Sequence, residues 1–398
     1  MVGRLVIVIL AAIVALGAWN WFRPVPAVAA SASLHSQETV QGPIPSLPWP
    51  KTGSAAVGAS GPGLIASSGN EQPASAASVT KVMTALIVLT DKPITLDQPG
   101  PSVTITSADV QSYQTDLAAN QSVVEVREGE KLTERELLEG LLIPSANNIA
   151  DTLARWDAGT VDAFVASMNK KAADLHLGQT TFTDTSGASP STVSTPSDLI
   201  ALGMEAMKDP VFAQIVSMGE TTLPVVGIVF NVDAALGQSG IIGIKTGSGL
   251  AEGANFLFAA TATVDGRPVT LYGCVMGQPT LAIAFAAART LIASMVPSLH
   301  VRRVIARNQA VAGYAAPWGG QADLVSTTDL DLVEWPGMIL RQRLDARALL
   351  INQPVNAGTP AGSEHVVLGD YSFDVPLVTG SPLYPPGRLW RLTRINFL

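Results

Sequence analysis

The sequence predicts an α+β fold, with an antiparallel sheet covered by helices and followed by a smaller all-β domain. Apolar residues recur at helical spacing in several segments between residues 77 and 207, which predicts a set of helices. Two β-branched runs joined by Asp265-Gly266 predict an antiparallel hairpin. Beyond Pro297 the helical spacing disappears. Short apolar runs then alternate with glycine- and proline-containing turns, as in an all-β module.

Length and composition indicate an ordinary globular protein. The 398 residues are enough for two or three domains, and 47% hydrophobic with only 14% charged residues excludes disordered and fibrous classes. The net charge of -8, without a Lys/Arg cluster, excludes a nucleic-acid partner. The one cysteine, Cys274, lies in an apolar run, so no intrachain disulfide is possible. The sequence contains no Cys/His metal constellation, and we expect no metal and no cofactor.

The N-terminal segment contains the targeting information. A basic start at Arg4 precedes the apolar run Leu5 to Trp19. The small-residue pattern Ala27-Val28-Ala29 favours cleavage by a signal peptidase, whereas tryptophans beside Arg23 suit a retained membrane anchor. Both alternatives place the protein outside the cytoplasm, in the cell envelope, either anchored by its N-terminus or secreted. The Ala-, Ser- and Pro-rich composition from Pro24 to Pro50 indicates a linker.

Shifts in composition divide the chain into three regions. Residues 1–46 are expected to be a signal peptide or membrane anchor with its linker. Residues 47–298 form a first folded domain, and residues 299–398 a β-rich C-terminal domain. The first domain is expected to open with two short strands, Ser54 to Ala59 and Gly63 to Ser67.

Helix start and stop signals mark the elements that follow. A helix is expected at Ser78, and loop and strand material between residues 98 and 130. Thr133 and Glu136 have capping-box spacing, so a helix begins there, and Pro144 ends it. Further helices of this domain are expected at Ile149 to Trp156, Val161 to Leu175, Leu199 to Met207 and Leu281 to Ser294. Its further strands are expected at 222–246, Phe256 to Val264 and Val269 to Met276. Strands of the C-terminal domain are expected at Val301 to Ala306, Leu330 to Val333, Ala348 to Ile351 and Val366 to Leu368.

Three polar clusters stand out against this background. Ser78-Val79-Thr80-Lys81 places a hydroxyl and an amine on one helical face, with β-carbons about 5 to 6 Å apart. Ser145-Ala146-Asn147 lies in a turn between two helices, and Lys245-Thr246-Gly247 ends a strand-like run. The order, separation and structural setting of the three clusters are together improbable by chance.

The triple resembles the signature of penicillin-binding proteins and class A β-lactamases. The surrounding residues resemble more closely those of the serine-type D-alanyl-D-alanine carboxypeptidases, the low-molecular-mass penicillin-binding proteins. The residues that support this are Ala77 to Leu86, Leu137 to Asn148, Phe182 to Gly187 and Thr195 to Leu199. The resemblance covers residues 47–298 and implies a transpeptidase/β-lactamase-like fold. It also implies removal of the terminal D-alanine from peptidoglycan stem peptides, and acylation of Ser78 by β-lactam antibiotics. The C-terminal domain is similar in position and character to the β-rich stalk of many members.

The residue types fit amide hydrolysis through a covalent intermediate. An unreactive amide is hydrolysed in two steps when a serine, activated by an adjacent base, forms an acyl-enzyme. None of the four histidines lies in the three clusters, so Lys81 is the expected base for Ser78. A lysine acts as a base at neutral pH only when burial and a nearby cation lower its pKa, and Lys245 is the candidate cation.

The other cluster residues have roles that follow from the resemblance. Ser145 is expected to be the third catalytic residue, relaying a proton to the departing D-alanine amine, and Asn147 to hold the substrate amide. Lys245 and Thr246 are expected to bind the terminal carboxylate, and Gly247 to let the substrate lie along the strand edge.

The oxyanion hole, also by resemblance, is the pair of backbone N–H groups of Ser78 and Ser248. Two features depart from the family pattern. The residues after the third cluster, Ser248-Gly249-Leu250, are small and apolar where the family has a bulky or threonine-rich start. Many relatives have an arginine shortly after the strand that matches Val269 to Met276, where it helps to bind the carboxylate. This sequence has none there, so carboxylate binding falls to the lysine and threonine of the third cluster.

Three alternative functions stay open. A class A β-lactamase would have a glutamate in the loop after the Ser145 cluster, but the only acids in residues 177–198 are Asp184 and Asp198. A non-catalytic penicillin-binding scaffold of the cell wall would keep the fold without turnover. A D,D-endopeptidase would cut cross-links between stem peptides. Measuring D-alanine release beside labelling by penicillin distinguishes these alternatives.

Overall fold

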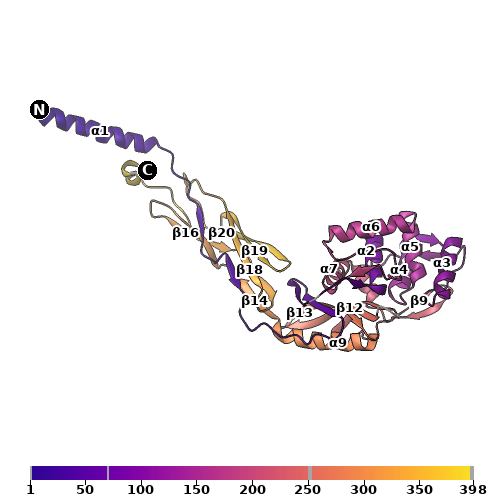
Figure 1. The fold of residues 1–398 in the computed structure, drawn as a ribbon. Coiled ribbons are helices and arrows are strands. Elements are labelled where there is room, and N and C mark those ends of the chain that lie inside the picture. Colours follow the sequence, from indigo (N-terminus) through magenta and orange to yellow (C-terminus); the bar gives the residue numbers. More distant parts are fainter. Residues whose placement is uncertain (1, 70, 250–252, 395–398) are drawn as a thin grey trace. The chain divides into compact units, whose positions relative to one another are not determined.

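The computed structural model describes residues 2–69, 71–249 and 253–394. The chain divides into two compact units, one formed by Met1–Pro43 with Val301–Leu398 and the other by Ile44–His300. Helices cover the sheet of the second unit, whereas strands dominate the C-terminal part of the first (Figure 1). The predicted α+β class with an additional β-rich part is confirmed.

The unit of residues 44–300 is built on a five-stranded antiparallel sheet with the order β11-β12-β13-β3-β4. The strands are β3 Ser54–Ala59, β4 Gly63–Ser67, β11 Ile241–Gly249, β12 Gly253–Val264 and β13 Arg267–Gln278. β12 and β13 meet at Asp265-Gly266, where both residues have positive φ, so the predicted hairpin is confirmed. β11 lies at one edge of the sheet, which leaves one of its sides unpaired within that sheet.

Helices pack on both faces of this sheet. Phe285 of α9 (Leu281–Met295) makes an edge contact with Phe256 of β12, with ring centroids 4.9 Å apart. Gly203 of α7 (Pro196–Ala206) lies against the side chain of Leu257. Successive strand residues point to opposite faces, so α7 and α9 cover opposite sides. Burial on both faces explains the continuous apolar character of β12 and β13.

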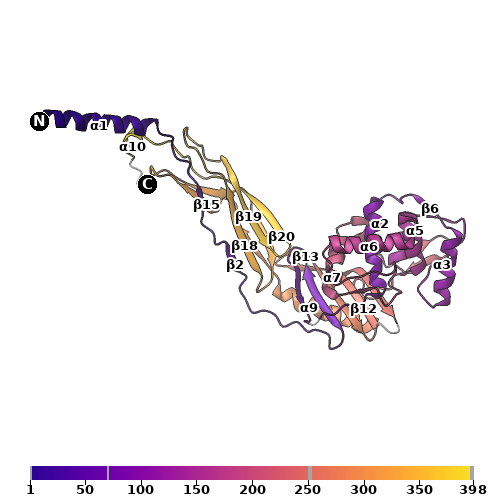
Figure 2. The ribbon, with the colours of Figure 1, turned by 45° about the horizontal axis from the view of Figure 1, so that its top comes forward.

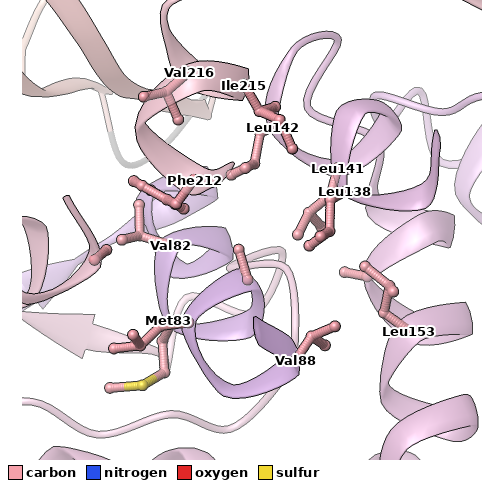
Figure 3. Close-up of a cluster of buried hydrophobic side chains, with 14 of the residues drawn as sticks. Val82, Met83, Val88, Leu138, Leu141, Leu142, Leu153, Phe212, Ile215 and Val216 are labelled. Atoms are coloured by element: carbon pink, nitrogen blue, oxygen red, sulfur yellow. The ribbon is translucent and has the colours of Figure 1, made fainter. Parts of the chain in front are cut away.

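The short helix η1 (Ala77–Thr80) leads into α2 (Lys81–Asp91), which lies in the middle of the helical layer. Every residue of α2 from Lys81 to Leu89 is buried. Figure 3 shows apolar side chains from α2, α4, α5 and α8 meeting around it. The labelled ones are Val82, Met83, Val88, Leu138, Leu141, Leu142, Leu153, Phe212, Ile215 and Val216. Because protein interiors are close-packed, this core fixes the position of the residues at the start of α2.

The predicted capping box is confirmed. The Thr133 hydroxyl accepts the Glu136 N–H at 3.3 Å, and the Glu136 carboxylate accepts the Thr133 N–H at 2.7 Å. Besides α2, α7 and α9, the α-helices described in this unit are α3 Ser107–Ala118, α4 Glu134–Leu142, α5 Asn147–Ala158, α6 Val161–Asp174 and α8 Pro210–Val216. Short elements complete the unit: β5 Ala74–Ser75, β6 Ser102–Thr104, β7 Lys131–Thr133, β8 Val193–Ser194, β9 Glu220–Leu223, β10 Gly227–Phe230, η2 Gln238–Gly240 and η3 Val296–Ser298.

Two segments of this unit differ from the prediction. Residues 107–118, expected as loop or strand, form α3, which Thr106 and Asp109 cap with a second capping box. This helix is mostly polar, so it lacks the apolar spacing that marks a helix in sequence. Residues 122–126, expected as a strand, are not one. The backbone N–H and C=O of Val124 pair with the side chain of Asn148 instead of with another strand.

The other unit contains a seven-stranded antiparallel sheet with the order β1-β15-β16-β20-β19-β18-β2 (Figure 2). Its strands are β1 Ala30–Ala32, β2 Gln37–Thr39, β15 Ala310–Ala315, β16 Gln321–Ser326, β18 Ile339–Ala346, β19 Pro360–Leu368 and β20 Tyr371–Thr379. β14 His300–Ile305 and β17 Leu330–Glu334 form a separate pair, and two helices, α1 Val2–Phe22 and α10 Arg388–Thr393, complete the unit. The strand expected at Ala348 to Ile351 is reduced to one bridge at Leu349.

The segment expected to be a linker is partly folded. β1 pairs with β15 and β2 pairs with β18, so both sheet edges come from residues before 40. These strands have only three residues each and are mostly exposed, so no alternation of apolar residues marks them in sequence. Backbone hydrogen bonding to a sheet formed far along the chain accounts for their conformation.

Candidate active site

The first polar cluster lies at the junction of η1 and α2. The Lys81 amine, fully buried, donates to the Ser78 hydroxyl over 2.8 Å. Ala77, directly before the serine, has a φ of 47°, a left-handed conformation that costs a non-glycine residue about 1 kcal/mol or more. The turn therefore holds the Ser78 side chain against Lys81 at the end of a rigid helix.

The second cluster meets the first through Asn147. Its Oδ1 accepts a hydrogen bond from Lys81 Nζ over 2.7 Å, and its N–H donates to the carbonyl of Ser122 over 2.7 Å. Asn147 is the first residue of α5, so the helix start fixes its direction. Ser145 is buried, with a φ of 67°, and lies two residues before it. In the part of the chain that the structure describes, the Ser145 hydroxyl makes no hydrogen bond.

The third cluster lies on β11, the edge strand that runs beside the Ser78 turn. Lys245 and Thr246 are buried, whereas Ser248 is exposed near the end of the strand. A Cβ atom on Gly247 would lie 3.0 Å from the backbone nitrogen of Ser78 and 3.0 Å from the carbonyl oxygen of Ala76. Only glycine allows this approach without a shift of the turn. The fold thus brings a strand edge alongside Ser78.

Lys81 is surrounded by features that oppose and favour its charge. Burial lowers the pKa of Lys81 well below its usual range, and the nearby positive charge of Lys245 lowers it further. Three carboxylates act in the opposite direction, Asp184, Asp116 and Asp151. Burial and a second lysine are the two causes that the sequence analysis required for a neutral lysine base.

Lys245 is itself perturbed. Burial lowers its pKa to about 7, and the carboxylate of Asp233 acts in the opposite direction. Its amine donates to the carbonyl oxygen of Thr246 over 3.1 Å. Lys245 thus gains or loses its proton near neutral pH. A small change in its surroundings therefore alters the fraction of Lys245 that is charged.

A loop that the sequence analysis assigned no role completes the cluster. The carbonyl oxygen of Ser186 accepts a third hydrogen bond from Lys81 Nζ, over 3.0 Å. Gly187 has a φ of 80°, and a Cβ there would lie 1.8 Å from the carbonyl oxygen of Ala77. Asp184 shapes this loop by accepting hydrogen bonds from the Ser186 hydroxyl and from the N–H of Ala188. The Ser-Gly pair was visible in the sequence, but nothing in it indicated a contact with Lys81.

Gln121 and Asp116 were also missed. The Gln121 side chain accepts a hydrogen bond from Asn147 Nδ2 over 3.2 Å. Asp116 is half-buried, and burial raises its pKa to about 6, with the charge of Lys81 acting in the opposite direction. Asp116 lies on α3, which the sequence analysis did not recognise as a helix, and no motif marks either residue.

Comparisons with known proteins agree with this geometry. Residues 56–280 match the family model described as D-alanyl-D-alanine carboxypeptidase. The chain is 37% identical over 215 residues to a D-alanyl-D-alanine carboxypeptidase, DacB2, of Mycobacterium tuberculosis, covering 51% of this chain and 69% of that protein. It is 32% identical over 225 residues to the D-alanyl-D-alanine carboxypeptidase of Streptomyces sp. strain K15, covering 52% and 74%. A D-alanyl-D-alanine endopeptidase of Pseudomonas aeruginosa is 31% identical over 147 residues, covering 37% and 44%.

Solved structures show the same relationship. The crystal structure of the Streptomyces K15 DD-transpeptidase superimposes with a TM-score of 0.55 at 28% identity, covering 64% of this chain and 98% of that chain. Penicillin binding protein 5 from Haemophilus influenzae has a TM-score of 0.63 at 19% identity, covering 85% and 99%. At that identity the second likeness concerns the fold alone.

Proposed function

Because this chain belongs to the D-alanyl-D-alanine carboxypeptidase family, we propose that it is a serine D,D-carboxypeptidase acting on peptidoglycan stem peptides that end in D-Ala-D-Ala. One observation supports this most strongly. A single buried amine, Lys81 Nζ, lies within hydrogen-bonding distance of both the Ser78 hydroxyl and the Asn147 amide oxygen. A serine beside a lysine whose pKa is lowered is the arrangement that amide hydrolysis without histidine requires.

The proposed reaction has two steps. The Ser78 oxygen attacks the carbonyl carbon of the penultimate D-alanine while its proton passes to Lys81. The C–N bond to the terminal D-alanine breaks, and Ser145 passes the proton to the departing amine. Water then attacks the ester carbonyl and gives one proton to Lys81. The bond between Ser78 and the acyl carbon breaks, Lys81 passes that proton to the Ser78 oxygen, and the shortened peptide leaves as a carboxylic acid. A β-lactam would be opened at its ring amide by the same attack and remain as an ester on Ser78.

Other residues of the cluster would bind the substrate. Asn147 would hold its amide, and Lys245 with Thr246 its terminal carboxylate. Gly247 lies close to the Ser78 turn, so a peptide can pair with the edge of β11. The backbone N–H groups of Ser78 and Ser248 are the proposed oxyanion hole, and one such donor is typically worth about 3 to 4 kcal/mol.

An assay of D-alanine release tests this function. The full chain is incubated with a peptide ending in D-Ala-D-Ala and, separately, with a labelled penicillin. Wild type should release D-alanine and take up label at Ser78, and Ser78→Ala should do neither. Ser167→Ala, at a half-buried serine of α6, is the matched control and should behave as wild type. Labelling without release would refute carboxypeptidase activity, and labelling of Ser78→Ala would refute the site.

Endopeptidase activity is a second candidate, because some relatives carry that name. A cross-linked dimer of stem peptides, assayed beside the linear peptide, separates the two activities. Faster cleavage of the cross-link than release of the terminal D-alanine would favour the endopeptidase. A scaffold without turnover would label with penicillin and cleave neither substrate. A class A β-lactamase would hydrolyse the penicillin and lose the label rapidly.

For location, we propose that α1 is a retained membrane anchor. The stretch Gly3–Phe22 is long and apolar enough to cross a membrane, and its side chains are almost entirely exposed. Two features favour retention over cleavage beyond Ala29. Val28 is buried and exchanges two backbone hydrogen bonds of 2.9 Å with Leu349, so the cleavage pattern itself is part of the folded unit.

Contacts at the end of α1 support the same proposal. The buried Asn20 side chain donates to the carbonyl oxygen of Leu392 on α10 over 3.0 Å. The Arg394 guanidinium donates to carbonyl oxygens of Asn20, Arg23 and Pro24, which end the helix or follow it. These carbonyls lack partners within the helix, so the arginine caps α1. The chain end thereby ties α1 to the folded unit.

Membrane fractionation and the mass of the mature N-terminus test retention. The intact protein should sediment with membranes, resist extraction at alkaline pH, and begin before Ala27. A chain that starts at Ala30 should be released. A native N-terminus at Ala30 would refute the proposal. The second apolar stretch, Leu281–Ser298, belongs mainly to α9, which packs on the sheet.

A further inference from the structure

A buried carboxylate interacts electrostatically with Lys245 and has no role in the reaction described above. Asp233, 5% exposed, follows β10 in the connection to β11. Its Oδ1 accepts the N–H of Ala235 over 2.9 Å. Its Oδ2 is buried, and among the described residues it has no hydrogen-bond partner. Burying a carboxylate oxygen without a hydrogen-bond partner costs folding free energy unless a nearby positive charge compensates it.

The backbone around Asp233 holds the carboxylate in place. The Asn231 side chain accepts the N–H of Asp233 over 2.9 Å and donates to the carbonyl oxygen of Met218 over 2.8 Å. Val232 donates to the carbonyl oxygen of Ile143, two residues before Ser145. The carboxylate thus lies on a segment tied to the Ser145 cluster at one end and to the strand of Lys245 at the other.

Lys245 is likewise buried, and its amine lacks a close negative charge among the described residues. It is 2% exposed, and its amine donates a hydrogen bond to the carbonyl oxygen of its own neighbour, Thr246. Among the described residues no carboxylate lies within ion-pair distance of it. An isolated buried ammonium would lose its proton unless a negative charge compensates it.

The two groups influence each other. Burial raises the pKa of Asp233 to about 6, and the positive charge of Lys245 opposes that rise. Burial lowers the pKa of Lys245 to about 7, and the negative charge of Asp233 opposes that fall. The Asp233 carboxylate and the Lys245 amine are thus each ionised to a greater extent in the presence of the other. Lys245 in turn faces Lys81, which faces Asp184, Asp116 and Asp151.

We propose that Asp233 is a positioning residue for the reaction, the buried counter-ion that keeps Lys245 charged so that it can bind the terminal carboxylate of the substrate. This inference rests on the proposed function, and it extends the site to a residue that would not touch the substrate. It also explains how a site without the expected arginine retains a positive charge for that carboxylate up to about neutral pH.

The sign of the pH dependence follows from the two charges. Lys245 binds a carboxylate only in its protonated form, so binding weakens as pH rises through about 7. Without the charge of Asp233, the pKa of Lys245 falls, and binding weakens at lower pH. An opposite charge near a buried group moves its pKa by about 1 to 3 units, so the alkaline limb should move down by at least about one pH unit.

Asp233→Asn is the test variant, because an asparagine Oδ1 can still accept the Ala235 N–H while the charge is removed. At pH 7.5 its acylation by a penicillin with a free carboxylate should fall about tenfold relative to wild type. Acylation by the corresponding penicillin methyl ester, which has no charge for Lys245 to bind, should change less than twofold. Asp209→Asn is the matched control: Asp209 also accepts backbone N–H groups in this unit, at the start of α8. It should behave as wild type towards both compounds.

A second variant pair tests the route through Lys245. Arginine keeps its charge without a counter-ion, so in a Lys245→Arg background Asp233→Asn should produce no further shift of the pH profile. Asp233→Asn with the rate and pH profile of wild type would overturn the proposal. An equal loss with the free acid and the ester would overturn it as well, because it would indicate a structural effect.

An NMR titration of Lys245 in the wild-type protein tests the proposal without any variant. With lysine labelled in the full chain, NMR should show Lys245 charged up to a pH of about 7. Lys245 neutral throughout the range from pH 5 to 7 would overturn the counter-ion, even if Asp233→Asn fails to fold. Failure of wild type to label with penicillin would instead refute the proposed function, and the titration would still decide the state of Lys245.

Discussion

Asn147→Asp places a negative charge directly on Lys81 with almost no change in side-chain size. Asn147 Oδ1 lies 2.7 Å from Lys81 Nζ, and both side chains are buried. The amide oxygen that accepts this hydrogen bond would become a carboxylate oxygen. The lysine would then hold its proton more tightly and could no longer take the proton of Ser78. The expected result is slower acylation.

The size of this effect can be worked from the distance. At 2.7 Å and an effective dielectric constant of about 20, the attraction is about 6 kcal/mol. If a third of it survives rearrangement of the neighbours, about 2 kcal/mol remains, which lowers the neutral fraction of Lys81 about 30-fold. The charge should therefore slow acylation at pH 7 by up to about 30-fold, and the rate should recover as pH rises.

Stopped-flow acylation by a fluorescent penicillin between pH 6 and 10 measures this effect. Asn147→Leu is the matched control, because it removes the hydrogen bond without adding charge. Its loss should be the same at every pH, whereas the loss in Asn147→Asp should shrink about tenfold for each pH unit. If the two variants lose activity in parallel at every pH, Lys81 is not the base and the reasoning is wrong.

Three further predictions concern the stability of the helical layer. Leu138→Ala removes a fully buried side chain from the core in Figure 3, and should cost about 3 to 5 kcal/mol of unfolding free energy. Thr133→Ala removes one half of the capping box of α4 and should cost about 1 kcal/mol. Glu134→Gln should stabilise the protein at pH 8 and have little effect at pH 4.5. Burial raises the pKa of Glu134 to about 7, so wild type loses stability as pH rises from its unfolded value of 4.5 towards 7, and the variant does not. Urea denaturation of the full chain, followed by the fraction that still labels with penicillin, measures all three.

The first two of these predictions have a conservative counterpart, and the third is checked by its pH dependence. Leu138→Met preserves most of the volume and should cost less than about 1.5 kcal/mol. Thr133→Ser retains the hydroxyl that accepts the Glu136 N–H and should be nearly neutral. A loss of stability in Leu138→Met as large as in Leu138→Ala would contradict the packing argument. A stabilising effect of Glu134→Gln that is equal at pH 4.5 and pH 8 would contradict the titration of a buried carboxyl.

Elements with a strong local signal could be predicted from the sequence. The strands at Ser54 and Gly63, the capping box of Thr133 and the turn at Asp265 agree with the prediction, because hydrophobic pattern and local hydrogen bonding determine them. α3 was missed because a mostly polar helix has no apolar stripe. β1 and β2 were missed because their partners lie far along the chain.

The candidate site divides in the same way. The residue types, their order and their spacing identified the three clusters, and the structure brings Lys81, Ser78 and Asn147 into direct contact. The Ser186 carbonyl and Asp233 could not be predicted. A carbonyl group has no identity in the sequence, and an isolated aspartate in a loop resembles any solvated one.

The sequence by itself determined the chemistry available to this protein: a serine, a lysine without histidine, an asparagine and a second lysine, each in a recognisable local setting. Only the tertiary structure decided whether those groups can act. The charge of Lys81 depends on burial and on Lys245, 164 positions away in the sequence numbering. Burial and charge–charge distance are properties of the packed interior, where water no longer screens the groups, and they arise only once helix and sheet edge have come together.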